Sequence, residues 1–397
     1  MGISTKTRTG SLVAGMIAAA LIVSTSPASG AAAQAVPAYD EALAAFAVVA
    51  NESQASGQPI VYQADSTHPL PAAHASGERN VVATKASVII IPNASGIRQD
   101  RLRPRPALLP DDHEGDALRC ENNDNATVAG RHQDAELYTP AEAWERMHQP
   151  SVLLNANYFE VRPQGGGTKW GDNRCSSPYG VYYDNHPGNP TQNSEAEGWP
   201  FLAGLPGFFH EETGITAPLD TFFFIDANKR GPRPTNSFEL VTNAGGDSLS
   251  SVNRARELEA LGEQFSAVSG TALLPRAGGG GELPSPDSGA SSTTRIALGY
   301  DRGNDRLLIV QGGGYRDGFT RESLTAVMRA LNSSLAIELD GGGSAAVVVN
   351  ESAVKFRGSA DTPQYLNCVN QACSSPVVQP SGTARPVPGW LSIRLDF

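Results

Sequence analysis

The stretch LAIELDGGGSAAVVVN, residues 335–350, sets the architecture of this 397-residue chain more than any other segment. Its first part is an apolar strand in which Ile337 and Leu339 share one face. Glu338 and Asp340 share the opposite face, with Cα atoms about 7 Å apart by the rise of a strand. The segment therefore predicts a strand that carries two carboxylates to its end.

Three glycines, Gly341, Gly342 and Gly343, follow this strand and lead to Ser344. Glycines let a ligand approach the backbone, and successive N–H groups in such a loop can bind an oxyanion. The loop is not a Walker phosphate-binding loop, because no Lys follows the glycines and a strand comes next. We interpret it as a ligand site, and a plain hairpin turn with an acidic flank is the alternative.

Further apolar segments predict strands at 86–91, 151–159, 179–183, 221–226, 293–301 and 305–312, the last two forming a hairpin. Helices are predicted at 140–147, 251–263 and 321–331. Thr139 and Thr320 cap the first and last helix, and the middle helix has Ala255, Leu258 and Leu261 on its buried face. Strands outnumber helices without strict alternation. The predicted fold class is therefore α+β, a sheet-rich single domain with a few helices and long loop insertions.

Two asparagines and an arginine lie at strand ends. Asn155 and Asn157 share a face at the end of the strand segment 151–159. Amides both donate and accept hydrogen bonds, so they suit sugar hydroxyls, and turn-forming asparagines are the alternative. Arg295 begins another strand. A lone arginine usually forms a surface ion pair, whereas an arginine carried into a site would bind an anion.

The first 35 residues have the pattern of a secretory signal peptide. Lys6 and Arg8 precede an apolar run at 11–23, and small residues follow. An uncleaved membrane anchor is the alternative. Both interpretations export the protein, so we expect it to be secreted or held in the cell envelope.

Four cysteines form an even set that we expect to be oxidised in an exported chain. The most economical pairing joins Cys368 to Cys373 and Cys120 to Cys175. A zinc site made from all four is the alternative, although their spacing lacks two CxxC pairs.

The composition excludes some partners. The chain has 41 acidic and 30 basic residues, a net charge of −11, which argues against a general nucleic-acid binder. No apolar run after the signal peptide is long enough to span a bilayer, so no membrane contact is expected. No cofactor is predicted, because the histidines show no metal-binding spacing. The acidic segment 111–116 could bind a divalent cation such as calcium, but it lacks EF-hand spacing, and a solvated loop is the favoured interpretation.

Taken in order, five segments resemble the phosphodiester glycosidase domain family. They are NANYF at 155–159, AVSGTALL at 267–274, TTRIALGYD at 293–301, LDGGGSAAVVVN at 339–350 and RPV at 385–387. The resemblance covers roughly residues 86–397, and residues 36–85 are expected to be an N-terminal extension, with regular structure starting at Ala86. The chain departs from the family at Glu338, where an Asn is usual, and at Gln311, where an Asp often precedes the glycine.

The resemblance implies a secreted hydrolase that cleaves the sugar–phosphate bond of glycosyl 1-phosphodiesters, with cell-wall or capsular polymers as candidate substrates. Asp340 would be the catalytic carboxylate, as nucleophile or as base for water, and Glu338 would assist it. The implied binding residues are Asn155 and Asn157 for sugar hydroxyls, Arg295 with the Gly341, Gly342 and Gly343 amides for phosphate, and Gly270 and Ser344 from the matched motifs.

Two other functions remain open. A glycosidase or transglycosylase of the same fold would act on ordinary glycosidic bonds of envelope glycans. A non-catalytic glycan-binding protein of the envelope would need no carboxylate at a scissile bond. In each case the expected partner is a carbohydrate or glycosyl phosphate.

Overall fold

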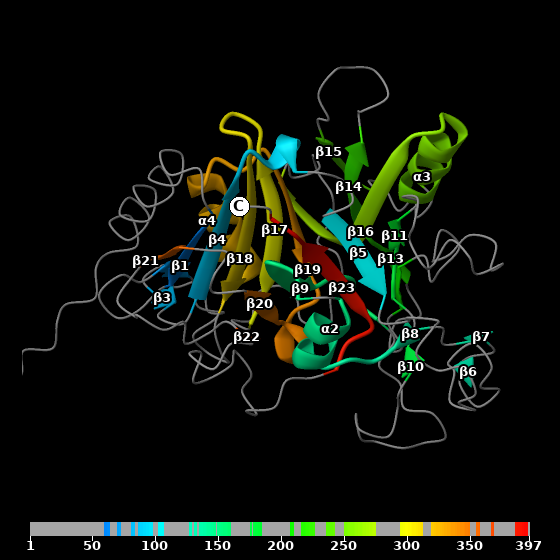
Figure 1. Ribbon diagram of the computed structural model, residues 1–397, viewed down its shortest axis with the longest axis horizontal. Coiled ribbons are helices and arrows are strands. Elements are labelled where there is room, and N and C mark those ends of the chain that lie inside the picture. The colour runs from blue at the N-terminus through cyan, green and yellow to red at the C-terminus, as the bar shows by residue number, and fades with distance from the viewer. Residues whose placement is uncertain are drawn as a thin grey trace, which may run out of the picture. The chain divides into compact units, whose positions relative to one another are not determined.

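Strands predominate in the computed structural model of the protein (Figure 1). The structure describes residues 59–63, 70–72, 81–83, 86–97, 102–106, 127–128, 131–132, 135–147, 149–159, 175–176, 178–184, 207–209, 216–226, 236–242, 250–274, 294–312, 319–349, 355–357, 367–368 and 386–395. Strands outnumber helices in these ranges, which confirms the prediction of a sheet-rich architecture. No helix in the same ranges has the length and apolar character needed to cross a membrane.

The largest sheet formed by the described residues has ten strands. In spatial order they are β15 (Asn236–Val241), β14 (Asp220–Asp226), β16 (Gln264–Leu274), β19 (Leu335–Leu339), β17 (Ile296–Asp301), β18 (Arg306–Gly312), β4 (Ala86–Pro92), β1 (Ile60–Gln63) and β21 (Lys355–Arg357), with β11 (Tyr183–Asp184) beside β16. The central strands from β16 to β4 pair antiparallel. The predicted hairpin is confirmed as β17 and β18.

β1 corrects the predicted start of regular structure at Ala86. This strand pairs antiparallel with β4, with Val61 opposite Ile89, and parallel with β21. Ile60 and Val61 are fully buried. Part of the expected N-terminal extension is therefore a strand within the main sheet.

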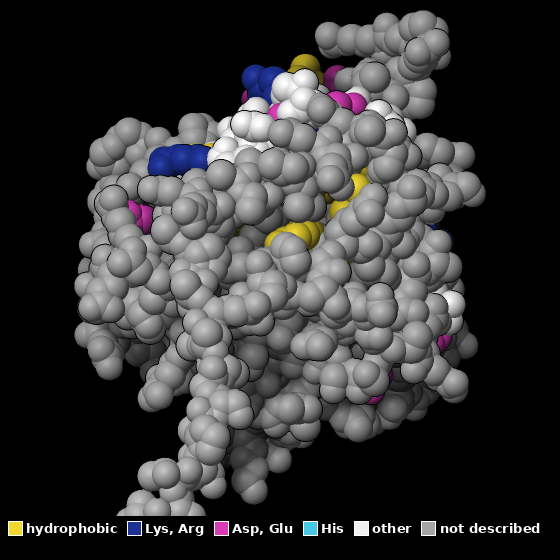
Figure 2. Space-filling model, turned by 90° about the vertical axis from the view of Figure 1, so that its left-hand side faces the viewer, with side chains coloured by type: hydrophobic (Ala, Val, Ile, Leu, Met, Phe, Trp, Pro, Cys, Tyr) yellow, Lys and Arg dark blue, Asp and Glu magenta, His cyan; other side chains and the backbone are white. Residues whose placement is uncertain are grey.

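A second sheet faces the first across an apolar core. Its strands are β22 (Asn367–Cys368), β20 (Val347–Val349), β9 (Val152–Asn155), β23 (Gly389–Ile393) and β5 (Leu102–Pro106). Ile309 and Ile337 of the large sheet share this core with Leu154 and Val347 of the second sheet. Burying each such side chain stabilises the fold by about 1.5–3 kcal/mol. On the face shown in Figure 2, apolar side chains of the described residues come to the surface in small, separate areas.

Helices cover the outer faces of these sheets. α4 (Arg321–Ala330) packs Leu324 and Met328 on the large sheet, on the side opposite the shared core. α2 (Pro140–Arg146) places Trp144 on the outer side of the second sheet. α3 (Ser250–Ala260) packs through Leu258 beside β14 and β16.

The helix starts confirm the capping predictions. The Thr139 hydroxyl accepts a hydrogen bond from the Glu142 backbone N–H, and the Glu142 carboxylate accepts from the Thr139 N–H at 2.8 Å. Thr320 and Ser323 form the equivalent box at α4. The prediction for Leu261 is wrong, because α3 ends at Ala260 and the Leu261 side chain is 61% exposed.

The remaining elements are short: β2 (Leu70–Ala72) with β3 (Val81–Ala83), β6 (Thr127–Val128) with β7 (Arg131–His132), β8 (Ala135–Glu136) with β10 (Cys175–Ser176), β12 (Gly207–Phe209) with β13 (Thr216–Pro218), and the 3₁₀ turns η1 (Ala94–Gly96) and η10 (Gly342–Ser344). The signal peptide at 1–35, the segment 111–116 and the side chains of the four cysteines lie outside what the structure describes. The two disulfides therefore stay predictions.

Candidate functional site

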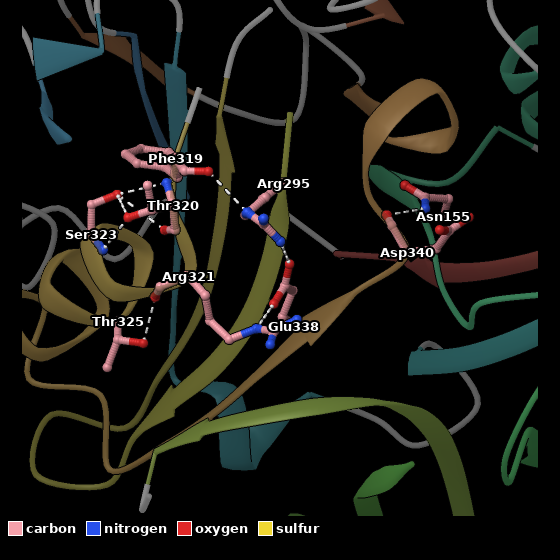
Figure 3. A network of polar contacts seen from close by, with 9 residues as sticks. All are labelled: Asn155, Arg295, Phe319, Thr320, Arg321, Ser323, Thr325, Glu338 and Asp340. Atoms are coloured by element: carbon pink, nitrogen blue, oxygen red, sulfur yellow. Dashed lines mark hydrogen bonds and ion pairs between the residues drawn. The ribbon is translucent and has the colours of Figure 1, made fainter. Parts of the chain in front are cut away.

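The end of β19 holds a buried cluster of charges centred on Glu338, which is 1% exposed (Figure 3). Arg295, one residue before β17, forms an ion pair with Glu338 Oε1. Arg321, the first residue of α4, donates from Nε to Glu338 Oε2 at 2.6 Å. Three segments distant in sequence thus bring two guanidinium groups to one carboxylate.

This cluster keeps Glu338 ionised. Burial on its own would raise the pKa of Glu338, but the guanidinium groups of Arg295 and Arg321 outweigh burial and lower that pKa below its usual value. Glu338 is therefore an anion that holds both arginines. It is poorly suited to donating a proton, which argues against the predicted assisting catalytic role.

The two arginines differ in access. Arg295 is 4% exposed and donates from Nε to the Phe319 carbonyl oxygen at 2.9 Å, in addition to its ion pair with Glu338. The Arg321 side chain is 20% exposed. Arg295 is the predicted phosphate ligand, but its guanidinium is buried in the fold, and Arg321 has the greater access to solvent.

Asp340 lies where the two sheets meet. Its backbone N–H donates to the Ala156 carbonyl oxygen at 3.0 Å, and its carbonyl oxygen accepts from Asn155 Nδ2 at 2.7 Å. Figure 3 shows Asn155 and Asp340 beside each other, while Glu338 points to Arg295 and Arg321. These hydrogen bonds join the Asp340 backbone, directly after β19, to the end of β9. The Asp340 side chain is half-buried at this junction of the two sheets.

The two asparagines bind backbone groups, which changes the role expected of them. Asn155 also accepts from the Ala346 N–H at 2.8 Å. Asn157 donates from Nδ2 to the carbonyl oxygens of Tyr179 and Val181 and accepts from the Ser269 N–H at 2.8 Å. Both are nearly fully buried. They join neighbouring backbone segments around the site, in place of the predicted contact with sugar hydroxyls.

The glycine loop is a compact turn packed against Thr294. The Gly342 N–H donates to the Thr294 carbonyl oxygen at 2.7 Å, so this amide is already engaged and the predicted oxyanion contact is wrong for it. Gly342 has φ of 59°, a conformation that favours glycine. A Cβ on Gly341 would lie 2.8 Å from the Thr294 oxygen. For the amides of Gly341 and Gly343, oxyanion binding stays a prediction.

Gly270 and Ser344 have packing roles. A Cβ on Gly270 would lie 2.0 Å from the Glu338 carbonyl oxygen, so only glycine lets β16 approach β19 this closely. Ser344 is buried, and its N–H donates to the Gly341 carbonyl oxygen at 3.1 Å within η10. Neither position supports the predicted direct contact with substrate.

Sequence reasoning missed Tyr158 and Arg321. Burial raises the pKa of the Tyr158 phenol well above its usual value, and the charges of Glu338 and Asp340 raise it further, against the opposing charges of Arg321 and Arg295. Tyr158 is therefore a neutral phenol among these charged groups. Its position directly after Asn157 could have indicated that Tyr158 belongs to the site. Arg321 was visible only as the residue after a helix cap.

Within the described ranges, no three His, Cys, Asp or Glu side chains gather as a metal site would require. The site therefore consists of the Arg295–Glu338–Arg321 cluster, Asp340 at the junction of the two sheets, and the Tyr158 phenol. Two guanidinium groups near a carboxylate suit a ligand that joins an anionic group to a neutral one.

Part of the chain matches a known protein family. Residues 230–393 match the sequence model of the phosphodiester glycosidase family, and this segment contains Gly270, Arg295, Arg321, Glu338 and Asp340. The predicted resemblance to that family is confirmed. A search of the curated proteins finds no match.

Two solved structures are similar to this chain. The catalytic domain of zebrafish N-acetylglucosamine-1-phosphodiester alpha-N-acetylglucosaminidase, auto-inhibited by its pro-peptide, is 14% identical with a TM-score of 0.41, over 85% of this chain and 89% of that one. A protein from Burkholderia pseudomallei is 13% identical with a TM-score of 0.39, over 78% of this chain and 74% of that one. Both likenesses are weak, and no feature of the site is inferred from them.

Proposed function

We propose that the protein is a secreted hydrolase that cleaves the sugar–phosphate bond of glycosyl 1-phosphodiesters, with cell-wall or capsular polymers as its substrates. The observation that carries the proposal is the cluster of two arginines and one glutamate beside Asp340, in a segment that matches a phosphodiester glycosidase family. In this proposal the sheet-rich unit is a single catalytic domain of the α+β class.

The chemistry follows from the leaving group. A phosphate monoester leaves readily from an anomeric carbon, so the site mainly needs to stabilise its charge and to supply a carboxylate near that carbon. Arg321, the more exposed arginine, is suited to the phosphate, and Asp340 acts as nucleophile or as base for water. Glu338 positions both guanidinium groups. The neutral Tyr158 phenol is a hydrogen-bond donor for the sugar or the phosphate.

The decisive experiment is incubation with a panel of sugar 1-phosphodiesters and cell-wall polymers, followed by mass analysis of the products. The expected products are a free sugar and a phosphate monoester, and Asp340→Asn protein is the matched control. Cleavage of neutral glycosides alone would support an ordinary glycosidase. Binding of glycans without turnover of any compound would support a non-catalytic glycan-binding protein.

Export and oxidation belong to the same proposal. N-terminal sequencing of exported protein should find a start close to residue 36, as the signal-peptide pattern in residues 1–35 predicts. Non-reducing peptide mapping should recover Cys120 linked to Cys175 and Cys368 linked to Cys373. Free thiols or crossed pairs in the exported protein would contradict this pairing.

A further inference from the structure

Two buried polar side chains stand out because they have no hydrogen-bond partner. Ser87 in β4 is 1% exposed and Gln311 in β18 is 2% exposed. Within the part of the chain that the structure describes, Ser87 Oγ and both side-chain polar atoms of Gln311 lack a partner. Buried polar groups in folded proteins are nearly always bonded, so a pair such as this calls for a ligand or another function.

The two residues are neighbours across the sheet. Gln311 is the register partner of Ser87 on one side and of Ile296 on the other, and Ile296 is the partner of Leu339. Alternation along the strands places Ser87 on the face of Ile89, and Gln311 on the face of Ile309. Both isoleucines belong to the core between the two sheets. The pair therefore faces that core, on the side of the sheet opposite the arginine–glutamate cluster.

This row of residues lies at the strand ends on the side of the sheet where Asp340 follows β19. Ser87 is the second residue of β4, Gln311 the last but one of β18, and Leu339 the last of β19. Adjacent strands are about 4.8 Å apart, so Gln311 lies about 10 Å from Leu339 and Ser87 about 14 Å. Such separations are comparable to the reach of a short oligosaccharide that has one end at Asp340.

The chemistry of the pair selects a neutral polar ligand. A serine hydroxyl and a glutamine amide each donate and accept hydrogen bonds and carry no charge. Their neighbours Ile89, Ile296 and Ile309 are apolar and fully or almost fully buried. A charged ligand would lose its hydration here without a counter-ion, whereas a sugar hydroxyl both donates and accepts.

We propose that Ser87 and Gln311 form a subsite for a hydroxyl group of a second, neutral sugar unit of the substrate. This inference rests on the proposed function and deepens it, because it makes the enzyme selective for polymeric or oligosaccharide substrates over small phosphodiesters. The sugar reaches the pair through local opening of the strand ends.

The test uses Gln311→Leu and Ser87→Ala protein with two matched methyl phosphodiesters, the first of a single sugar 1-phosphate and the second of a disaccharide 1-phosphate. For the second substrate we expect KM to rise at least about tenfold in each variant, the size of effect one hydrogen bond can have. KM for the single-sugar substrate should stay unchanged. Melting temperatures should stay the same or rise, because a polar group without a partner is removed.

Thr221→Val is the matched control. Thr221 and Ser269 are buried in the same sheet, and their hydroxyl oxygens are hydrogen-bonded at 2.8 Å. This variant should lower the melting temperature, because it removes a buried hydrogen bond and leaves the Ser269 hydroxyl with only its bond to the Val181 carbonyl oxygen, and it should change KM for neither substrate.

An unchanged KM for the second substrate in Gln311→Leu protein would overturn the subsite, and a change in melting temperature without any change in KM would indicate an internal water only. If wild-type protein turns over neither substrate, the proposed function fails separately. Equilibrium binding of the neutral disaccharide to wild-type and Gln311→Leu protein then decides the subsite, and equal binding would overturn it.

Discussion

The hairpin of β17 and β18 has a buried ion pair at each end, and the two ends differ in how many segments of the chain the charged groups come from. At the turn, Asp301 pairs with Arg306 and accepts from the Gly303 and Asn304 N–H groups, so one anion meets one cation within six residues. At the open end, Arg295 and Arg321 both pair with Glu338, and Arg321 comes from α4.

The difference distinguishes a structural ion pair from a candidate ligand site. The Asp301–Arg306 pair is local, balanced and closed by the turn that it stabilises, so it has no need of a further partner. The cluster at Glu338 joins three separate segments, and Arg321 within it is partly exposed. Variants at the turn should therefore change mainly stability, whereas variants at the open end should also change ligand binding.

The largest effect is expected at the turn. Asp301→Ala leaves the fully buried Arg306 without its counter-ion, which should lower the free energy of unfolding by about 3–5 kcal/mol. Denaturant unfolding measures it. The control is Glu257→Ala, which removes an exposed partner of Arg254 and should cost about 1 kcal/mol or less. Equally small losses of unfolding free energy in both variants would show that the buried Asp301–Arg306 pair contributes no more than a surface ion pair.

Glu338→Gln should come next, with a loss of about 3 kcal/mol, because two guanidinium groups lose their anion while Arg321 can partly rehydrate. The same unfolding measurement checks it, and a variant as stable as wild type would show that the cluster is not held by Glu338.

The pH dependence sharpens this second prediction. Folding lowers the pKa of Glu338, so its ion pairs stabilise the fold above the ordinary carboxyl pKa of 4.5, and this stability is lost as the pH falls below 4.5 through the folded-state pKa. Glu338→Gln protein should lose less stability than wild type over that acid range. Parallel stability curves for the two proteins below pH 4.5 would contradict the ionised state of Glu338.

Asp340→Asn should act on turnover and leave stability alone. Because Asp340 is half-buried and held through its backbone, the near-isosteric amide should leave the melting temperature nearly unchanged. Turnover of a sugar 1-phosphodiester should fall at least about a hundredfold, the lower end for losing an acid–base group. Steady-state kinetics beside a melting curve measure both. Near-normal turnover would remove Asp340 from the mechanism.

The smallest effect is expected for Arg321→Ala. A charge-assisted hydrogen bond contributes about 1.5 kcal/mol, so binding of the phosphate-bearing ligand should weaken about tenfold, with little change for the neutral sugar. Calorimetric titration of both ligands checks it. Arg329→Ala, at an exposed position of the same helix, is the control and should change neither affinity. Equal losses for both ligands would indicate a structural role for Arg321.

Local features of the fold could be predicted from the sequence because they depend on neighbouring residues. The capping boxes at Thr139 and Thr320 and the alternation around Glu338 are of this kind. The partners of the site could not be predicted in the same way. The pairing of Arg321 with Glu338 depends on how α4 lies on the large sheet, and the asparagine roles depend on which backbone lies beside them.

The place of β1 in the sheet has a consequence for how the chain can be shortened. A truncated protein starting at Ala86 would lack the strand that lies between β4 and β21. The unpaired N–H and C=O groups of β4, flanked by Val88 and Ile90, would then form an open edge that invites pairing with another molecule. Such a fragment should aggregate, so expression and crystallisation should start ahead of Ile60.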